Sequence, residues 1–161
     1  MKRLGIALLA AAACSMAHAV GWNYEASTDK MTGKKSAEAQ TVSDNSLNFD
    51  FPYKGTNRGY ITVRQHPQYG LDVLISIDKG QMLCSSYDCK VTVKFDDAPP
   101  VRFSGNGPSD HSSQTIFLQG AAKFIASAKK AQKILVQFNA YQNGSPVLEF
   151  STPQPLDWPR K

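Results

Sequence analysis

The sequence predicts a mainly β fold: a single-domain antiparallel β-sandwich or flattened barrel with one α-helix in its C-terminal half. Apolar and polar residues alternate along most of the chain after residue 20, and this period of two places one side of a strand on a core. Turn-forming residues separate the alternating runs at short intervals, so consecutive strands are expected to pair. The runs suggest about eight to ten short strands.

Residues 1–19 are typical of a secretory signal peptide. They begin with Lys2 and Arg3, continue with the apolar run 4–13, and end in the small-x-small sequence of residues 17–19. An alternative form of export is also open, because Cys14 follows three alanines and could carry a lipid anchor. Both routes place the domain outside the cytoplasm, in the periplasm or in the secreted fraction.

Removal of the signal would leave residues 20–161, a domain of 142 residues with a net charge of +3. This length suits one β-rich domain that needs no metal to hold its core. The mild charge does not indicate a nucleic-acid partner, and no phosphate-binding glycine motif is present. The only long apolar run is the signal itself, which is shorter than the roughly 20 residues of a spanning helix. We therefore expect no cofactor, no metal and no transmembrane segment.

The strands are expected in chain order, each justified by its own alternation. Trp22 and Tyr24 open the first strand, and the polar stretch 28–45 is expected to be a long loop holding a short strand. The later runs predict strands over residues 47–51, 61–64, 73–77, 91–95, 101–104, 134–140 and 148–150, with one more ending at Cys84.

One helix is expected to interrupt this pattern, from about residue 120 to residue 131. Its apolar residues recur at the i, i+3, i+4 and i+7 spacing of an amphipathic helix: Ala121, Phe124, Ile125 and Ala128. The lysines around its C-terminus are expected to be solvated and to complement the helix dipole, with an anionic partner as the alternative.

Cys84 and Cys89 are expected to form a structural disulfide, because an oxidising compartment favours pairing. A redox-active pair is the alternative, although two intervening residues rather than four are usual. A zinc site would need further ligands that are not nearby. The bridge would fix the loop formed by Ser85, Ser86, Tyr87 and Asp88, which makes this loop a candidate binding element.

The most polar stretch, residues 104–113, is expected to be a surface loop that could bind a partner. Asp110 and His111 stand beside two serines, which are residue types that a hydrolase uses. Neighbours in sequence rarely point at one another, however, and catalytic groups are assembled in space. Asp96 and Asp97 are expected to form a turn, with a share in a calcium site as the alternative.

Several tyrosines lie in or beside predicted turns, where exposed rings can receive a sugar or a protein. Tyr53, Tyr60, Tyr69 and Tyr87 are the candidates for such a binding surface, and packing over the sheet edge is the alternative. His66 and His111 are the only histidines beyond the signal. Each is expected to be a surface or hydrogen-bonded side chain, since no metal-ligand spacing surrounds it.

Six short motifs together resemble a widespread, uncharacterised family of small secreted or envelope-associated bacterial proteins. They are Trp22 with residues 29–32 (DKMT), residues 51–55 (FPYKG), residues 59–64 (GYITVR), residues 79–81 (KGQ) with Cys84, residues 93–97 (VKFDD), and Phe150 with residues 156–158 (LDW). The resemblance covers almost the whole exported part of the chain and implies export and a single β-rich domain. It carries no catalytic residue. The order helix, strand, strand at the C-terminus is also similar in architecture to the invasion-associated locus B family.

The function that these patterns favour is a non-enzymatic exported protein that binds an envelope protein or glycan through its loops. One form of this hypothesis is an inhibitor or immunity protein whose loops fill a target's cleft. The first alternative is a cell-wall hydrolase that uses the loop of Asp110 and His111. The second is a carrier of a small apolar ligand, which would need an internal cavity.

Overall fold

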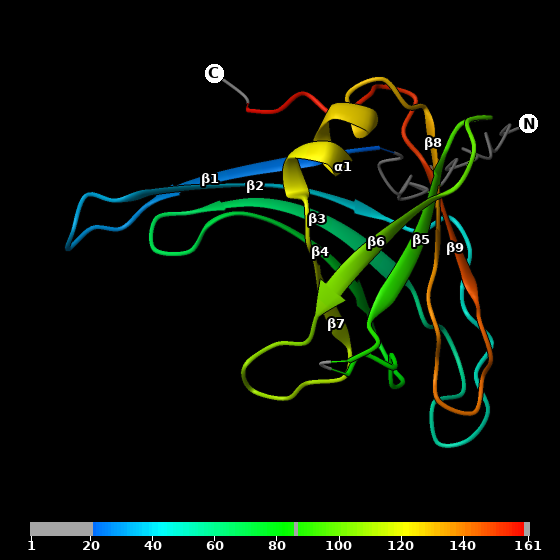
Figure 1. Cartoon of the computed structure of the whole chain (residues 1–161). Coiled ribbons are helices and arrows are strands. Elements are labelled where there is room, and N and C mark those ends of the chain that lie inside the picture. Colours follow the sequence, from blue (N-terminus) through cyan, green and yellow to red (C-terminus); the bar gives the residue numbers. More distant parts are fainter. Residues whose placement is uncertain (1–20, 86, 160–161) are drawn as a thin grey trace, which may run out of the picture.

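The computed structural model describes residues 21–85 and 87–159, so the predicted signal peptide, Cys14 and Ser86 lie outside the described residues. This part of the chain is mainly antiparallel β-structure with a single short helix (Figure 1). None of its helices is long and apolar enough to cross a membrane. The elements are β1 (Asn23–Thr28), β2 (Lys35–Val42), β3 (Gly59–His66), β4 (Gly70–Ile77), β5 (Lys90–Phe95), β6 (Val101–Asn106), β7 (Thr115–Leu118), α1 (Ala121–Ala128), β8 (Lys133–Gln137) and β9 (Val147–Ser151).

All nine strands belong to one sheet of order β1-β2-β3-β4-β7-β6-β5-β8-β9, and every neighbouring pair is antiparallel. The first four strands form a meander. After β4 the chain forms β5 at a distance, and β6 and β7 then fill the two positions between β5 and β4. The helix α1 connects β7 to β8, which pairs with the other side of β5. Figure 1 shows that β1 to β4 run across the direction of β5, β6, β8 and β9, so the sheet folds over on itself.

The core lies between the two halves of this folded sheet. Each central strand turns alternate apolar residues inward, such as Val91 and Val93 of β5, which are fully buried. The helix covers the open space between the halves, because Phe124 is fully buried and its ring meets Phe95 and Phe103 edge-on. The core therefore joins residues from nearly every element into one hydrophobic cluster.

The two halves also meet along a seam between the start of β3 and β9. A Cβ added at Gly59 would overlap the buried side chain of Leu148. Beside this contact, the segment after β2 runs along β9: the backbone N–H of Asp44 donates to the carbonyl of Glu149 at 2.7 Å. The side-chain amide of Asn45 donates to the carbonyl of Val147 and accepts from the N–H of Glu149.

The structure confirms the mainly β class and the C-terminal helix, and it differs from the sequence prediction in several details. The sheet is not closed into a barrel. The helix ends at Ala128, and Gly120 begins it in a left-handed conformation at φ 79°. Residues 47–51 form no strand: Leu47 and Phe49 are buried, but Phe51 is exposed in a turn. No strand ends at Cys84, where an isolated bridge at Met82 is the only pairing described.

Two strands are longer or additional relative to the sequence prediction. β2 occupies eight residues of the polar stretch that was expected to be mostly loop. β7, with four residues, follows the polar loop 107–114 and had no clear alternation of its own. Both strands lie between two other strands, so their backbone N–H and C=O groups are hydrogen-bonded on both sides. Pairing of this kind stabilises a strand even where its side chains show little alternation.

Candidate functional site

Four loops gather at one end of the molecule, and we call them together the loop end. They are residues 50–57 after β2, residues 79–89 between β4 and β5, residues 107–114 between β6 and β7, and residues 139–146 between β8 and β9. Figure 1 shows them on the side opposite the helix. They come from separate parts of the sequence, so only the folded sheet brings them together.

The segment 79–89 holds the other three loops through main-chain and side-chain hydrogen bonds. Its Gln81 carbonyl accepts from the N–H of Tyr141 at 2.9 Å, and Leu83 donates to the carbonyl of Asn139 at 2.8 Å. The N–H of Met82 donates to the carbonyl of Ser113 at 2.8 Å. These bonds give the loop end a defined shape although most of its residues are outside strands.

Asn57 ties the first loop to this segment from a fully buried position. Its side-chain amide donates to the carbonyl of Lys79 at 2.9 Å, and its side-chain oxygen accepts from the N–H of the same residue at 3.0 Å. Its own N–H donates to the hydroxyl of Ser46 at 2.8 Å. A buried amide with these partners acts as a bridge between two loops far apart in sequence.

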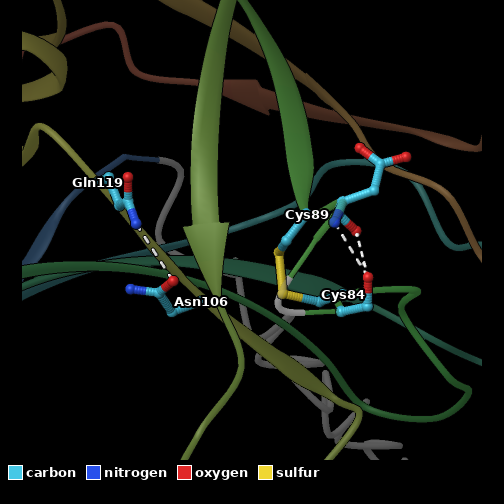
Figure 2. Close-up of a disulfide and its surroundings, with 6 residues drawn as sticks. Cys84, Cys89, Asn106 and Gln119 are labelled. Carbon is cyan, nitrogen blue, oxygen red and sulfur yellow. Dashed lines mark hydrogen bonds between the residues drawn. A yellow bond between two sulfur atoms is a disulfide. The ribbon is translucent and has the colours of Figure 1, made fainter.

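The predicted disulfide between Cys84 and Cys89 is present, and it lies beside the end of β6 (Figure 2). Within its loop, the N–H of Asp88 donates to the hydroxyl of Ser85 at 3.0 Å, and the N–H of Ser85 donates to the carbonyl of Asp88 at 3.2 Å. Tyr87, at the tip of this loop, is 98% exposed. The bridge and the two bonds therefore hold a fully exposed aromatic ring on a short, closed loop.

Asn106 and Gln119 fix the strand beside the disulfide. The amide of Gln119 donates to the side-chain oxygen of Asn106 at 3.2 Å, as Figure 2 shows. Gly105 is required at this place, because an added Cβ would overlap Ile116 and approach the sulfur of Cys89. The disulfide thus packs directly against the sheet.

The loop of Asp110 and His111 has the geometry of a surface turn. The Asp110 carboxylate accepts from the N–H of Ser112 at 2.9 Å, and His111 adopts a left-handed backbone at φ 59° and is exposed. Within residues 21–85 and 87–159, no hydrogen bond joins the His111 imidazole to a carboxylate or a hydroxyl. The same part of the chain contains no group of three or more potential ligands placed to hold a metal ion.

The remaining candidate residues lie in two different places. Tyr53 belongs to the loop end, where it packs against the core and its hydroxyl accepts from the amide of Gln81 at 3.2 Å. Tyr69 does not: it lies in the β3–β4 hairpin and stacks on His66 with ring centroids 4.6 Å apart. The structure therefore brings together the disulfide loop, Tyr53 and the Asp110 loop, and it leaves Tyr69 outside.

One ionisable group near the loop end has a perturbed pKa. Tyr60 of β3 donates its phenol hydrogen to the carboxylate of Asp78 at 2.8 Å. This hydrogen bond, assisted by partial burial, raises the pKa of Tyr60 above its usual value. The same carboxylate accepts from the backbone N–H of Arg58. Asp78, directly after β4, therefore connects the end of β4 to the start of β3, where the first two loops of the loop end adjoin these strands.

The interior between the two halves is occupied by side chains. The largest fully buried residues include Phe124, Phe138 and Phe150, each at 1% exposure or less. This packing fills the space that a carrier of an apolar ligand would need. Two of these rings come from β9 and from the segment after β8, which the alternation in the sequence had already placed inward.

Sequence reasoning missed two residues that shape this end of the molecule. For Asn57, no local pattern distinguishes a buried asparagine from an exposed one. Arg102 lies in the strand that was predicted over residues 101–104, opposite Thr92 of β5. The sequence did not indicate that β8 would bring Gln137 to the other side of Thr92.

Comparison with known proteins found no match among family models, curated proteins or solved structures. The resemblance to secreted proteins of unknown role therefore stays a prediction.

Proposed function

We propose that this chain is an exported, non-enzymatic binding domain of the bacterial envelope, which receives a protein partner on its loop end. The observation that carries the proposal is the display of large apolar side chains on loops that are fixed by hydrogen bonds. Phe51 is 83% exposed, Tyr87 98%, Tyr141 51% and Leu83 49%. Exposed aromatic side chains on a rigid support are typical anchors of protein interfaces.

The fixed shape of these loops supports binding, because little of the binding free energy is then needed to order them. The disulfide closes the loop of Tyr87, and the bridge from Gln81 to Tyr141 joins it to the last hairpin. The disulfide also agrees with the proposed export, since such bonds persist in oxidising compartments. The Asp110 carboxylate, which a hydrolase would need to orient a base, is engaged with its own turn.

The test is saturable binding of the exported protein to envelope extract, measured for two matched double variants. The first, Tyr87→Ala with Tyr141→Ala, removes two rings of the loop end. The second, Tyr69→Ala with Met31→Ala, removes two exposed apolar side chains from the hairpin tips, where exposure is 66% and 93%. We expect the first variant to weaken binding about 30-fold or more, as loss of an interface anchor does.

The hairpin variant is expected to bind as the unaltered protein does. Equal loss in both variants would contradict a specific role of the loop end. Failure to recover any saturable partner would contradict the proposal as a whole. Circular dichroism of each variant checks that the fold is retained, which is expected because all four side chains are exposed.

A further inference from the structure

A polar cavity lies on the outward face of β5, β6 and β8, beside the disulfide loop. Its volume is about 290 Å³. The same strands turn Val91, Val93 and Val136 into the core, so the cavity is on the opposite face from the hydrophobic cluster. Six of its lining residues are polar: Asp88, Lys90, Thr92, Arg102, Gln137 and Asn139.

The sheet register places three of these side chains in one row. Thr92 of β5 is directly opposite Arg102 of β6 on one side and Gln137 of β8 on the other. Directly opposite residues on one face have Cβ atoms about 4.5–5.5 Å apart. A guanidinium, a hydroxyl and an amide therefore stand side by side on three rigid strands, with Lys90 two residues before Thr92 on the same face.

The charges in the cavity leave one cation without a partner. Lys90 is paired with Asp88, whose carboxylate is 3.1 Å from the ammonium. The Arg102 guanidinium makes no hydrogen bond or ion pair with any residue of 21–85 or 87–159. The lining thus carries one uncompensated positive charge, on the side chain whose planar fork matches a carboxylate in two parallel hydrogen bonds.

We propose that this cavity binds a carboxylate-bearing sugar residue of an envelope glycan, with the carboxylate on Arg102. The hydroxyl of Thr92 and the amides of Gln137 and Asn139 are donors and acceptors that suit the hydroxyl groups of a sugar. The single free charge suits a monoanion, and the nearby carboxylate of Asp88 disfavours a dianionic phosphate. This inference goes beyond the proposed function, because it concerns the strand face that adjoins the loop end and another class of ligand.

The test is a titration of the exported protein with glucuronate, followed by the backbone amide signals of β5, β6 and β8 in NMR spectra. We expect saturable shifts at Thr92 and Gln137, with a dissociation constant on the order of millimolar, as for a small ligand on an open site. Glucose, which has the hydroxyl groups without the carboxylate, is expected to bind at least about 10-fold more weakly.

Two variants remove the same charge from the same face. Arg102→Gln is expected to weaken glucuronate binding about 10-fold or more, because the forked carboxylate contact is lost. Lys94→Gln removes a cation of β5 that does not line the cavity, and it is expected to leave binding within about twofold. Both side chains point away from the core, so neither change is expected to unfold the protein.

Four results would overturn the inference. One is equal binding of glucose and glucuronate, and another is an equal loss in the Arg102→Gln and Lys94→Gln variants. The third is absence of saturable binding of glucuronate. The fourth is tighter binding of glucose 6-phosphate or of an acidic dipeptide than of glucuronate. None of these results depends on the rings of the loop end, so the outcome is separate from the test of the protein partner.

Discussion

A single buried asparagine, Asn57, connects the first loop of the loop end to the central one. Asn57→Ala would leave both the N–H and the carbonyl of Lys79 without their side-chain partner. We expect the free energy of unfolding to fall by about 2–4 kcal/mol, because two half-buried backbone groups lose the hydrogen bonds of a fully buried amide. Urea unfolding measures it, with Asn48→Ala as the control, since Asn48 is exposed. Equal losses would contradict the bridging role.

Tyr60 predicts how stability changes at alkaline pH. Its pKa is raised in the folded state by the hydrogen bond to Asp78, so the fold favours the neutral phenol. The stabilisation is therefore complete below about pH 10 and is lost as the pH rises through the raised pKa. We expect the difference in unfolding free energy between the unaltered protein and Tyr60→Phe to shrink as the pH rises above about 10. If the difference in unfolding free energy between the two proteins did not change with pH, the stabilising role of the Tyr60–Asp78 hydrogen bond would be contradicted.

Individual residues were the hardest part to predict from the sequence. The disulfide of Cys84 and Cys89 was predictable, because the oxidising compartment that the sequence led us to expect favours pairing. The burial of Asn57 and the unpaired guanidinium of Arg102 among the described residues were not, because neither the burial nor the pairing of a polar side chain follows from the local sequence pattern. Tyr69 was grouped with Tyr87 by its local context alone, and the structure places the two on different parts of the molecule.

Among the elements, the closed loop of the disulfide makes the most direct prediction. Replacement of Cys84 and Cys89 by alanine would remove a short covalent loop, which stabilises by about 2 kcal/mol in the chain-entropy model. We expect the urea midpoint to fall accordingly, and Tyr87 to become more mobile. As a control, a reductant should lower the urea midpoint of the unaltered protein and leave the midpoint of the double alanine variant unchanged. If neither the alanine replacements nor the reductant lowered the urea midpoint, the prediction would be contradicted.

Strands were predictable where alternation was complete and apolar. β3, β4, β5, β8 and β9 each turn at least two large apolar residues inward, and each was expected near its observed place. β2 was underestimated because its inward residues are small or polar: Ala37, Ala39 and Thr41. Residues 47–51 alternate without forming a strand. Leu47 and Phe49 are buried in the core, and such burial does not require the backbone to be hydrogen-bonded to a neighbouring strand.

At the scale of the whole molecule, the seam between β3 and β9 holds the two halves of the sheet together. Gly59→Ala would force a methyl group into the fully buried side chain of Leu148. We expect a loss of about 1–3 kcal/mol, as overpacking in a dense core causes. In Leu148→Ala the space is free, so adding Gly59→Ala should cost little there. A double-mutant cycle measures this coupling, and additive losses would contradict the seam.

The order of the strands could not be predicted, although their number could. Chain order alone favours pairing of consecutive strands, yet β4 pairs with β7 and β5 pairs with β8. Which strands pair depends on which apolar faces meet in the core, and this cannot be read from the local sequence of any one strand. The loop end and the cavity both depend on this order, which explains why their residues were only partly expected.

The seam has a further consequence for how copies of this protein can associate. Along β9, the outward backbone groups of Val147 and Glu149 are already occupied by Asp44 and Asn45, while β1 has a neighbouring strand on one side only within residues 21–85 and 87–159. Strand addition at such an exposed edge joins sheets edge to edge. Since Asp44 and Asn45 already occupy the β9 edge, we expect edge-to-edge addition through β1 to end at a pair of molecules.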